Sequence, residues 1–210
     1  MVSIEDKGLD ELLKNIFPFW NYFKENKLNL KSLSGKDGVY AFWWMNDEDF
    51  KVIKSLNLDV VIKGKQNRKS ENSTEKFIVY ETKWDLTPIV ADRICLYVGK
   101  SHDIANRVEQ HLYQSFKHHW YKHNEHKLKF RLDNMLLKRT TACQLRAGIE
   151  HLYKFRVEGF NFHEILKGHI GISFYRSESA LQEDKMKERF YLEDLAIGYL
   201  KPLFNLDSER

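Results

Sequence analysis

The 210-residue chain has little cysteine, proline or glycine: two cysteines, three prolines and ten glycines. Two cysteines cannot build the disulfide framework of a small secreted protein or a four-cysteine zinc site. The low proline and glycine content excludes collagen-like and low-complexity architectures. The longest strongly apolar run, residues 39–45, is far shorter than the ~20 residues of a membrane-spanning helix. The first residues carry no basic and apolar secretion signal, so we expect a soluble, cytoplasmic protein that does not bind membranes.

The residues that are present suit one folded domain. A hydrophobic share of 42%, including 14% aromatic residues, is enough for a buried core and excludes global disorder. Charge is uneven, because residues 100–156 hold 12 Lys and Arg against 5 Asp and Glu in a chain whose net charge is +4. A basic segment is the electrostatic pattern of a protein that binds nucleic acid, although a solvated lysine-rich helix has the same composition.

Hydrophobic periodicity predicts helices alternating with short strands, which favours an α/β fold. The predicted helices cover residues 9–24 with an interruption at Pro18, 102–115, 141–155 and about 180–200. The predicted strands cover residues 39–45, 77–80, 94–98 and 170–175, with a turn at 34–38 and a polar loop at 63–75.

The last predicted helix contains one unexpected carboxylate. Ser179-Ala180-Leu181-Gln182 has the pattern of a capping box, and Pro202 follows the predicted end. The apolar stripe of this helix consists of Met186, Phe190, Glu193, Ile197 and Leu200. Because a buried charge is costly unless it is paired or bound to a metal, Glu193 either pairs with a basic side chain or acts as a metal ligand.

Four short motifs occur in order along the chain. They are Gly38-Val39-Tyr40, then Tyr97-Val98-Gly99, then Arg107 and His111 four positions apart on a helix, and finally Glu193 before Lys201-Pro202 and Asn205. Together these motifs resemble the GIY-YIG nuclease family. The resemblance implies a small, mainly antiparallel GIY-YIG-like sheet flanked by helices, within a single elaborated domain of residues 1–210.

The resemblance covers only part of the chain. It predicts a core of residues 37–46, 93–115 and 168–207, a helical extension at 1–36, an insertion at 47–92 and a basic helical insertion at 116–167. The two motif tyrosines, Tyr40 and Tyr97, lie 57 positions apart, which is wide for the family. Either residues 47–92 are an insertion, or the first motif lies elsewhere, with Tyr80 as the next candidate.

The implied activity is that of a divalent-metal-dependent endonuclease that hydrolyses DNA and leaves 5′-phosphate and 3′-hydroxyl ends. The implied catalytic residues are Tyr40, Tyr97, Arg107, His111 and Glu193. Glu193 would bind one Mg²⁺ or Mn²⁺, Arg107 would neutralise a phosphate oxygen, and Tyr40 would act as general base. Each residue also has a structural interpretation: core packing for the tyrosines, a surface charge for Arg107, and a hydrogen-bonded structural histidine for His111.

The predicted DNA-contacting residues are mostly basic: Lys100, Asn205, Lys117, Lys122, Lys127, Lys129, Lys138 and Arg139. His119 and His123, four positions apart within the cluster of histidines at 118–126, could also bind zinc, but the interleaved lysines favour a basic helix that faces phosphate. The sequence contains no nucleotide-binding motif, so we expect no small-molecule cofactor. The alternative function is a module that binds DNA or RNA without cutting it; the target, the biological role and a possible dimer stay open.

Overall fold

The computed structural model describes residues 4–18, 30–45, 59–63, 77–81, 86–117, 143–146, 148–149 and 162–205. Its helices are α1 (Ile4–Lys14), α4 (Ile104–Lys117), α8 (Phe162–His169) and α9 (Gln182–Leu200), with a 3-10 helix η1 (Leu30–Leu33). Its strands are β1 (Phe17–Pro18), β2 (Gly38–Trp44), β3 (Asp59–Lys63), β4 (Phe77–Glu81), β5 (Ile89–Val90), β6 (Arg93–Ser101) and β7 (Ile170–Arg176).

A five-stranded antiparallel sheet organises this mixed α/β fold. Its strand order is β1-β7-β2-β6-β5, and every pair is antiparallel, as predicted for a mainly antiparallel sheet. β3 and β4 form a separate two-stranded sheet. β2 and β6 are hydrogen-bonded neighbours although their motif tyrosines lie far apart in the sequence.

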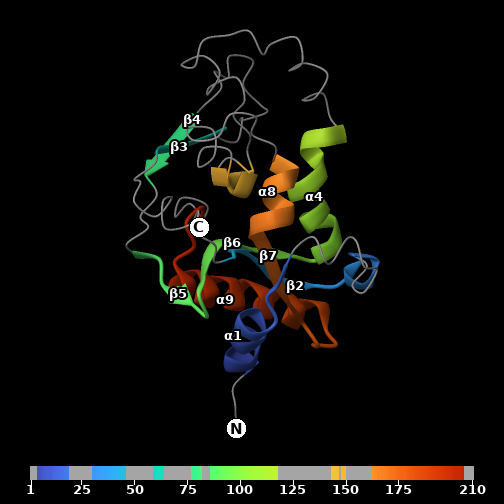
Figure 1. Ribbon diagram of the computed structural model, residues 1–210. Helices are drawn as coiled ribbons and strands as arrows, with labels where there is room; N and C mark the ends of the chain where they lie inside the picture. The colour runs from blue at the N-terminus through green and yellow to red at the C-terminus, as the bar shows by residue number, and fades with distance from the viewer. Residues whose placement is uncertain are drawn as a thin grey trace, which may run out of the picture.

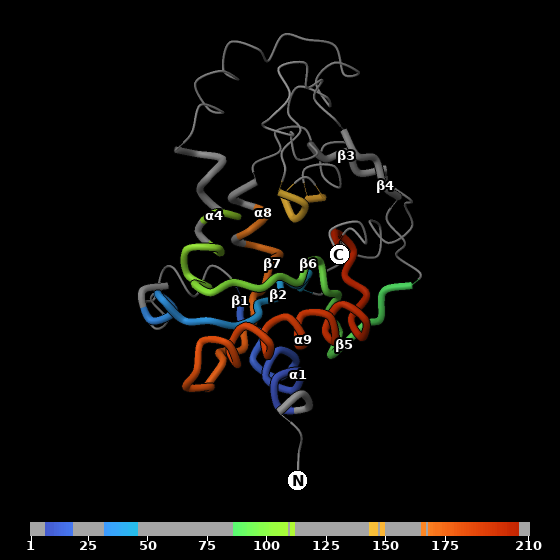
Figure 2. The backbone as a smooth tube through the Cα atoms, turned by 180° about the vertical axis from the view of Figure 1, so that it is seen from behind, coloured from blue at the N-terminus to red at the C-terminus, as the bar shows by residue number. Residues whose placement is uncertain are grey.

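Helices cover both faces of the sheet. α4 and α8 lie on one face, and α1 and α9 lie on the other (Figures 1 and 2). All residues of β2 are buried, which explains why this strand is apolar on both sides. We call the side of Tyr40, Phe42 and Trp44 the α4 face and the side of Val39, Ala41 and Trp43 the α9 face.

The residues after α9 return to the sheet along β6. The backbone N–H groups of Leu203 and Phe204 donate to the carbonyl oxygens of Cys95 and Leu96 at 3.2 and 2.8 Å. Pro202, Leu203 and Phe204 are buried. This segment therefore provides hydrogen-bond partners for the edge of β6 that the two-residue strand β5 leaves uncovered.

The first helix differs from its prediction of residues 9–24. α1 begins at Ile4 and ends at Lys14, and the chain then enters the edge strand β1, which contains Pro18. An edge strand tolerates proline because the missing N–H group is not needed for pairing. Ile16 and Phe17 are therefore outside the helix, and residues 19–24 lie outside the described part of the chain.

The bounds predicted for the last helix are confirmed, but two of its predicted details are wrong. Leu181 is the N-cap residue and makes no side-chain capping bond, so the capping box does not form. α9 buries Leu192, Ala196 and Leu200, whereas Met186 and Phe190 of the predicted stripe are 45% and 49% exposed. The small side chain of Ala196 lets the helix approach the sheet on a neighbouring line of residues.

The remaining predicted elements are largely in place. The four predicted strands correspond to β2, β4, β6 and β7, and α8 begins within the helical segment predicted at 116–167, while β1, β3 and β5 were not predicted. The predicted helix at 141–155 is helical at residues 144–146 and 148–149, Cys143 is described and lies outside the helix, and the other residues are not described. None of the described helices has the length and apolar content needed to cross a membrane.

Candidate active site

Tyr40 and His111 form the centre of a buried cluster on the α4 face. The Tyr40 hydroxyl and His111 Nε2 are 2.8 Å apart in a hydrogen bond, and His111 Nδ1 lies 3.0 Å from the Cys143 sulfur. Tyr40 is fully buried and His111 is 5% exposed. β2, α4 and the segment at Cys143 therefore meet in one continuous chain of hydrogen-bonding groups.

Aromatic rings fix the orientation of the His111 imidazole. The ring centroids of Tyr40, Phe42 and Tyr97 lie 5.6, 5.6 and 5.1 Å from that of His111, all in edge-to-face geometry. Such contacts add to the burial free energy of aromatic pairs. The imidazole is consequently held in one position between β2, β6 and α4.

A β-bulge directs Tyr97 into this cluster. Phe42 is opposite Tyr97 and Trp43 is opposite Cys95, so Leu96 is an extra residue in β6. Leu96 and Tyr97 consequently both pack in the core of the α4 face although they are consecutive. Strict alternation would send one of them to the opposite face, and bulges commonly redirect a side chain in this way.

Gly99 makes room for the tyrosine pair. A Cβ atom at this position would lie 2.5 Å from the Tyr40 hydroxyl oxygen and 2.9 Å from Cε1 of Tyr97. Both distances are shorter than van der Waals contact, so the rings occupy the space of the missing side chain. The glycine of the second motif is therefore required by packing around Tyr40.

Arg107 supplies the positive charge of the cluster. Burial raises the pKa of Tyr40 well above its ordinary value, the neighbouring Tyr97 raises it further, and Arg107 opposes both through its charge and a hydrogen bond. Burial, and to a smaller extent Arg107, lower the pKa of His111 to about 3. His111 is therefore neutral at physiological pH, and Tyr40 is protonated.

Glu193 is engaged in an ion pair on the other face of the sheet. Its carboxylate binds the ammonium group of Lys100, and their side chains are 12% and 28% exposed. The same ammonium group lies 4.2 Å above the ring centroid of Phe190. Burial raises the pKa of Glu193, Lys100 lowers it, and the charge of Asp194 raises it again, so that the net change is upward.

The sheet separates Glu193 from the tyrosine–histidine cluster. The electrostatic partners of Tyr40 are Tyr97, Arg107 and Cys143, whereas those of Glu193 are Lys100 and Asp194. α9 packs on the side of Val39, Ala41 and Trp43 (Figure 1). Four of the five predicted catalytic residues thus lie together, and the fifth lies across β6 from them.

Asn205 has a structural contact within the described residues. Its side-chain carbonyl accepts from the Val98 N–H, and its amide donates to the Val98 carbonyl, both at 2.8 Å. Lys117 is the last residue of α4. The other predicted DNA contacts and the histidines at 118–126 lie outside the described residues: Lys122, Lys127, Lys129, Lys138 and Arg139.

The alternative first-motif residue, Tyr80, is on β4, which pairs with β3 in the second sheet. Tyr40 instead lies beside Tyr97, with 6.3 Å between ring centroids. Cys143 was not predicted as part of any site. It is 32 positions from His111, so no local spacing could have indicated the contact.

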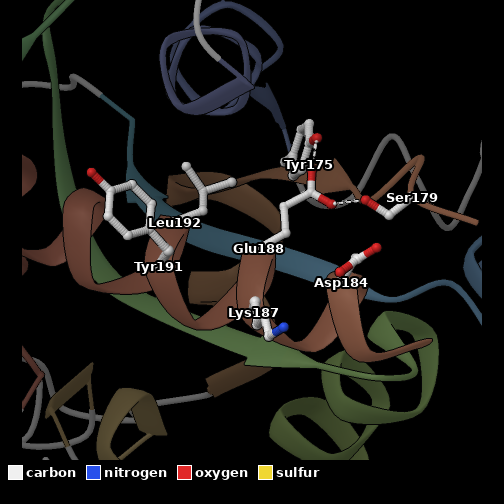
Figure 3. Close-up of a pocket in the computed structure, with 7 residues that line it drawn as sticks. All are labelled: Tyr175, Ser179, Asp184, Lys187, Glu188, Tyr191 and Leu192. Atoms are coloured by element: carbon white, nitrogen blue, oxygen red, sulfur yellow. Dashed lines mark hydrogen bonds between the residues drawn. The ribbon is translucent and has the colours of Figure 1, made fainter. Parts of the chain in front are cut away.

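A pocket of about 370 Å³ is lined by groups of α9 and its neighbours: Tyr175, Ser179, Asp184, Lys187, Glu188, Tyr191 and Leu192 (Figure 3). Glu188 accepts hydrogen bonds there from the hydroxyl groups of Tyr175, Ser177 and Ser179. Tyr175 and Leu192 belong to the core of the α9 face, so this pocket is separate from the Tyr40 cluster.

Glu193, the predicted metal ligand, is partly buried in the described part of the chain. No group of three or more His, Cys, Asp or Glu residues is arranged there to hold a metal. Glu193 fits the simplest Mg²⁺ site, because this ion often binds one or two carboxylates and keeps several of its waters. Metal binding there would require Lys100 to leave the carboxylate.

Comparisons of the chain with protein-family models, with curated proteins and with solved structures found no match. The resemblance to the GIY-YIG nucleases is therefore a prediction from the motif residues alone.

Proposed function

We propose that this protein is a divalent-metal-dependent endonuclease that hydrolyses DNA phosphodiester bonds. The observation that carries the proposal is the buried hydrogen bond between Tyr40 and His111, with Tyr97 and Arg107 beside it. These four residues are the ones at which the sequence resembles the nuclease motifs. Phosphodiester hydrolysis needs a general base, a general acid and a positive charge that stabilises the phosphate.

In this proposal Tyr40 is the general base for the attacking water. A protonated phenol with a raised pKa cannot accept a proton unless it gives up its own. Neutral His111 can accept the phenol proton through Nε2 at 2.8 Å while Tyr40 takes the proton of the water. The relay would end with a neutral phenol, an imidazolium and a hydroxide that attacks phosphorus. Because burial lowers the pKa of His111, the negative charge that develops at the phosphate would have to stabilise the imidazolium.

Arg107 has two roles in the proposed reaction. Its guanidinium stabilises negative charge on Tyr40 and can neutralise a non-bridging oxygen of the phosphate. Glu193 would hold the Mg²⁺ or Mn²⁺ ion, which would polarise the phosphate and stabilise the leaving oxygen. Because Glu193 lies across β6 from Tyr40, the proposal requires that one phosphate reaches both groups. DNA must also reach the hydroxyl group of Tyr40, which is buried in this state.

The second candidate function is a module that binds DNA or RNA without cutting it. The burial of Tyr40, Tyr97 and His111 favours this alternative, as does the ion pair that occupies Glu193. In such a protein the tyrosine–histidine cluster would be a polar part of the core.

Incubation with supercoiled plasmid distinguishes the two functions. The endonuclease proposal predicts nicked or linear DNA with Mg²⁺ and intact DNA with EDTA, and end mapping should find 5′-phosphate and 3′-hydroxyl groups. Single-stranded and branched DNA and RNA belong in the same panel. Intact nucleic acid throughout, with a salt-dependent gel shift, would support the binding module instead.

A further inference from the structure

Cys143 offers a function that the sequence motifs do not assign. Its sulfur lies 3.0 Å from Nδ1 of His111, on the side of the imidazole opposite to Tyr40. Cys143 is partly buried and belongs to no disulfide. Its contact with the ring is therefore a hydrogen bond between the cysteine sulfur and an imidazole nitrogen.

Two hydrogen-bonding patterns satisfy the geometry of His111. In the first, Nδ1–H donates to the sulfur, and Nε2 accepts from the Tyr40 hydroxyl. In the second, the thiol donates to Nδ1, and Nε2–H donates to the Tyr40 oxygen. A neutral imidazole carries one proton, so each pattern corresponds to one tautomer.

The hydroxyl proton of Tyr40 favours the first pattern. Tyr40 is fully buried, and its hydrogen-bonding neighbours are His111 and Arg107. Arginine can only donate, so His111 Nε2 is the acceptor available to the phenol among these two groups. In the second pattern the phenol proton would have neither as an acceptor, whereas the bond that the first pattern gives up is a weak one, because a thiol is a weak donor.

We propose that Cys143 is a positioning residue for His111: its sulfur accepts the Nδ1–H bond and so keeps Nε2 free to take the proton of Tyr40. This assignment rests on the proposed nuclease function only for its effect on catalysis. The tautomer itself is a property of the folded protein and can be measured without any substrate.

The groups facing His111 define the expected pH behaviour. They are Tyr40 from β2, Tyr97 from β6, Arg107 from α4, and Cys143. While the phenol proton passes to Nε2, the pair neither gains nor loses a proton, so this step should be independent of pH between about 6 and 8. Without the relay the phenol must lose its proton to solvent, and the rate should rise with pH.

The test is long-range ¹H–¹⁵N correlation NMR on histidine-labelled protein, with His111→Gln used to assign the signals. We expect wild-type His111 in the Nδ1–H tautomer at pH 7 and a partial shift towards the Nε2–H tautomer in Cys143→Ala, because Nδ1–H loses its acceptor while Tyr40 still favours a free Nε2. Cys143→Ser, whose hydroxyl can accept the same bond, should restore the wild-type tautomer. Cys95→Ala is the matched control, since Cys95 is a buried cysteine in the core of the α9 face.

Cleavage assays on the same variants complete the test. Cys143→Ala should lower the cleavage rate about tenfold or more, the usual scale for losing a partner that orients a histidine ring, and should acquire a rise with pH. An Nε2–H tautomer in the wild type, or an unchanged tautomer in Cys143→Ala, would overturn the assignment. If the tautomers behave as expected and no protein cuts DNA, the positioning contact stands and the nuclease proposal fails.

Discussion

Acid should destabilise the fold through His111 at a pH where the stability of most proteins does not yet depend on acid. His111 has a pKa of about 3 when folded, against an ordinary value of 6.5, because it is buried. Between these values the unfolded chain binds one more proton than the native protein, so stability falls as pH falls. From pH 7.5 to pH 5 this single group should remove about 2 kcal/mol of the free energy of unfolding.

Urea denaturation of wild type and His111→Gln at pH 7.5, 6.5, 5.8 and 5 measures this contribution. The variant loses hydrogen bonds and should be less stable at every pH, but its stability should change less with pH than that of wild type. The difference between the two proteins cancels the other titrating groups, including Glu193, whose raised pKa acts in the opposite direction. His102→Gln, at an exposed position before α4, serves as the control.

The account would be refuted if wild type and His111→Gln lost stability equally between pH 7.5 and pH 5. Equal slopes would mean that the imidazole can take up a proton in the native state, as an exposed histidine does. In that case burial would not lower the pKa of His111 in the native state.

Further predictions concern metal, packing and DNA contact. Glu193→Gln should keep DNA binding and lower Mg²⁺-dependent cleavage by roughly 10²–10⁴-fold, and cleavage within tenfold of wild type would exclude Glu193 as the metal ligand. Gly99→Ala should cost about 1–3 kcal/mol in urea denaturation because its Cβ meets the Tyr40 ring, whereas Gly198→Ala, with open space around the position, should be neutral or stabilising. Asn205→Ala should cost about 1–3 kcal/mol in the same assay, since the Val98 backbone loses both partners, and an unchanged midpoint would contradict that role. Neutralising Lys122, Lys127 and Lys129 should reduce the slope of log K against log salt by about 0.9 for each lost phosphate contact, and an unchanged slope would move the DNA surface elsewhere.

The strands could be predicted because the composition of their residues indicates that they are buried. β2 is rich in apolar and aromatic residues on both sides, and this composition favours a strand covered on both faces. The neighbouring positions of Tyr40 and Tyr97 followed from the motif resemblance, although β3 and β4 intervene in the sequence. Local composition and motif order were sufficient for this part of the fold.

The helix faces could not be predicted equally well. Residues spaced by three and four formed an apolar stripe through Phe190, yet the helix packs through Leu192 and Ala196 instead. Several adjacent lines on an amphipathic helix satisfy the same periodicity, and the partner surface decides among them. The position of Glu193 relative to the sheet therefore required the structure.

The composition of the site also depends on tertiary contacts. The bulge at Leu96 turns Tyr97 towards His111, and no residue pattern in β6 predicts this bulge. Cys143 reaches the imidazole from a segment that is distant in sequence. The sequence could identify Tyr40 and His111 as candidates, but their hydrogen bond and the neutral state of the imidazole are consequences of burial.

Single-turnover cleavage of duplex DNA by wild type and Tyr40→Phe in Mg²⁺ tests the central claim most directly. The substitution removes one hydroxyl and keeps the ring that packs against Gly99, with Tyr199→Phe as an exposed control. The account predicts cleavage by wild type and by the control, and a rate roughly 10²–10⁴-fold lower for Tyr40→Phe. Cleavage by Tyr40→Phe at the wild-type rate, or no Mg²⁺-dependent cleavage by the wild type, would contradict it.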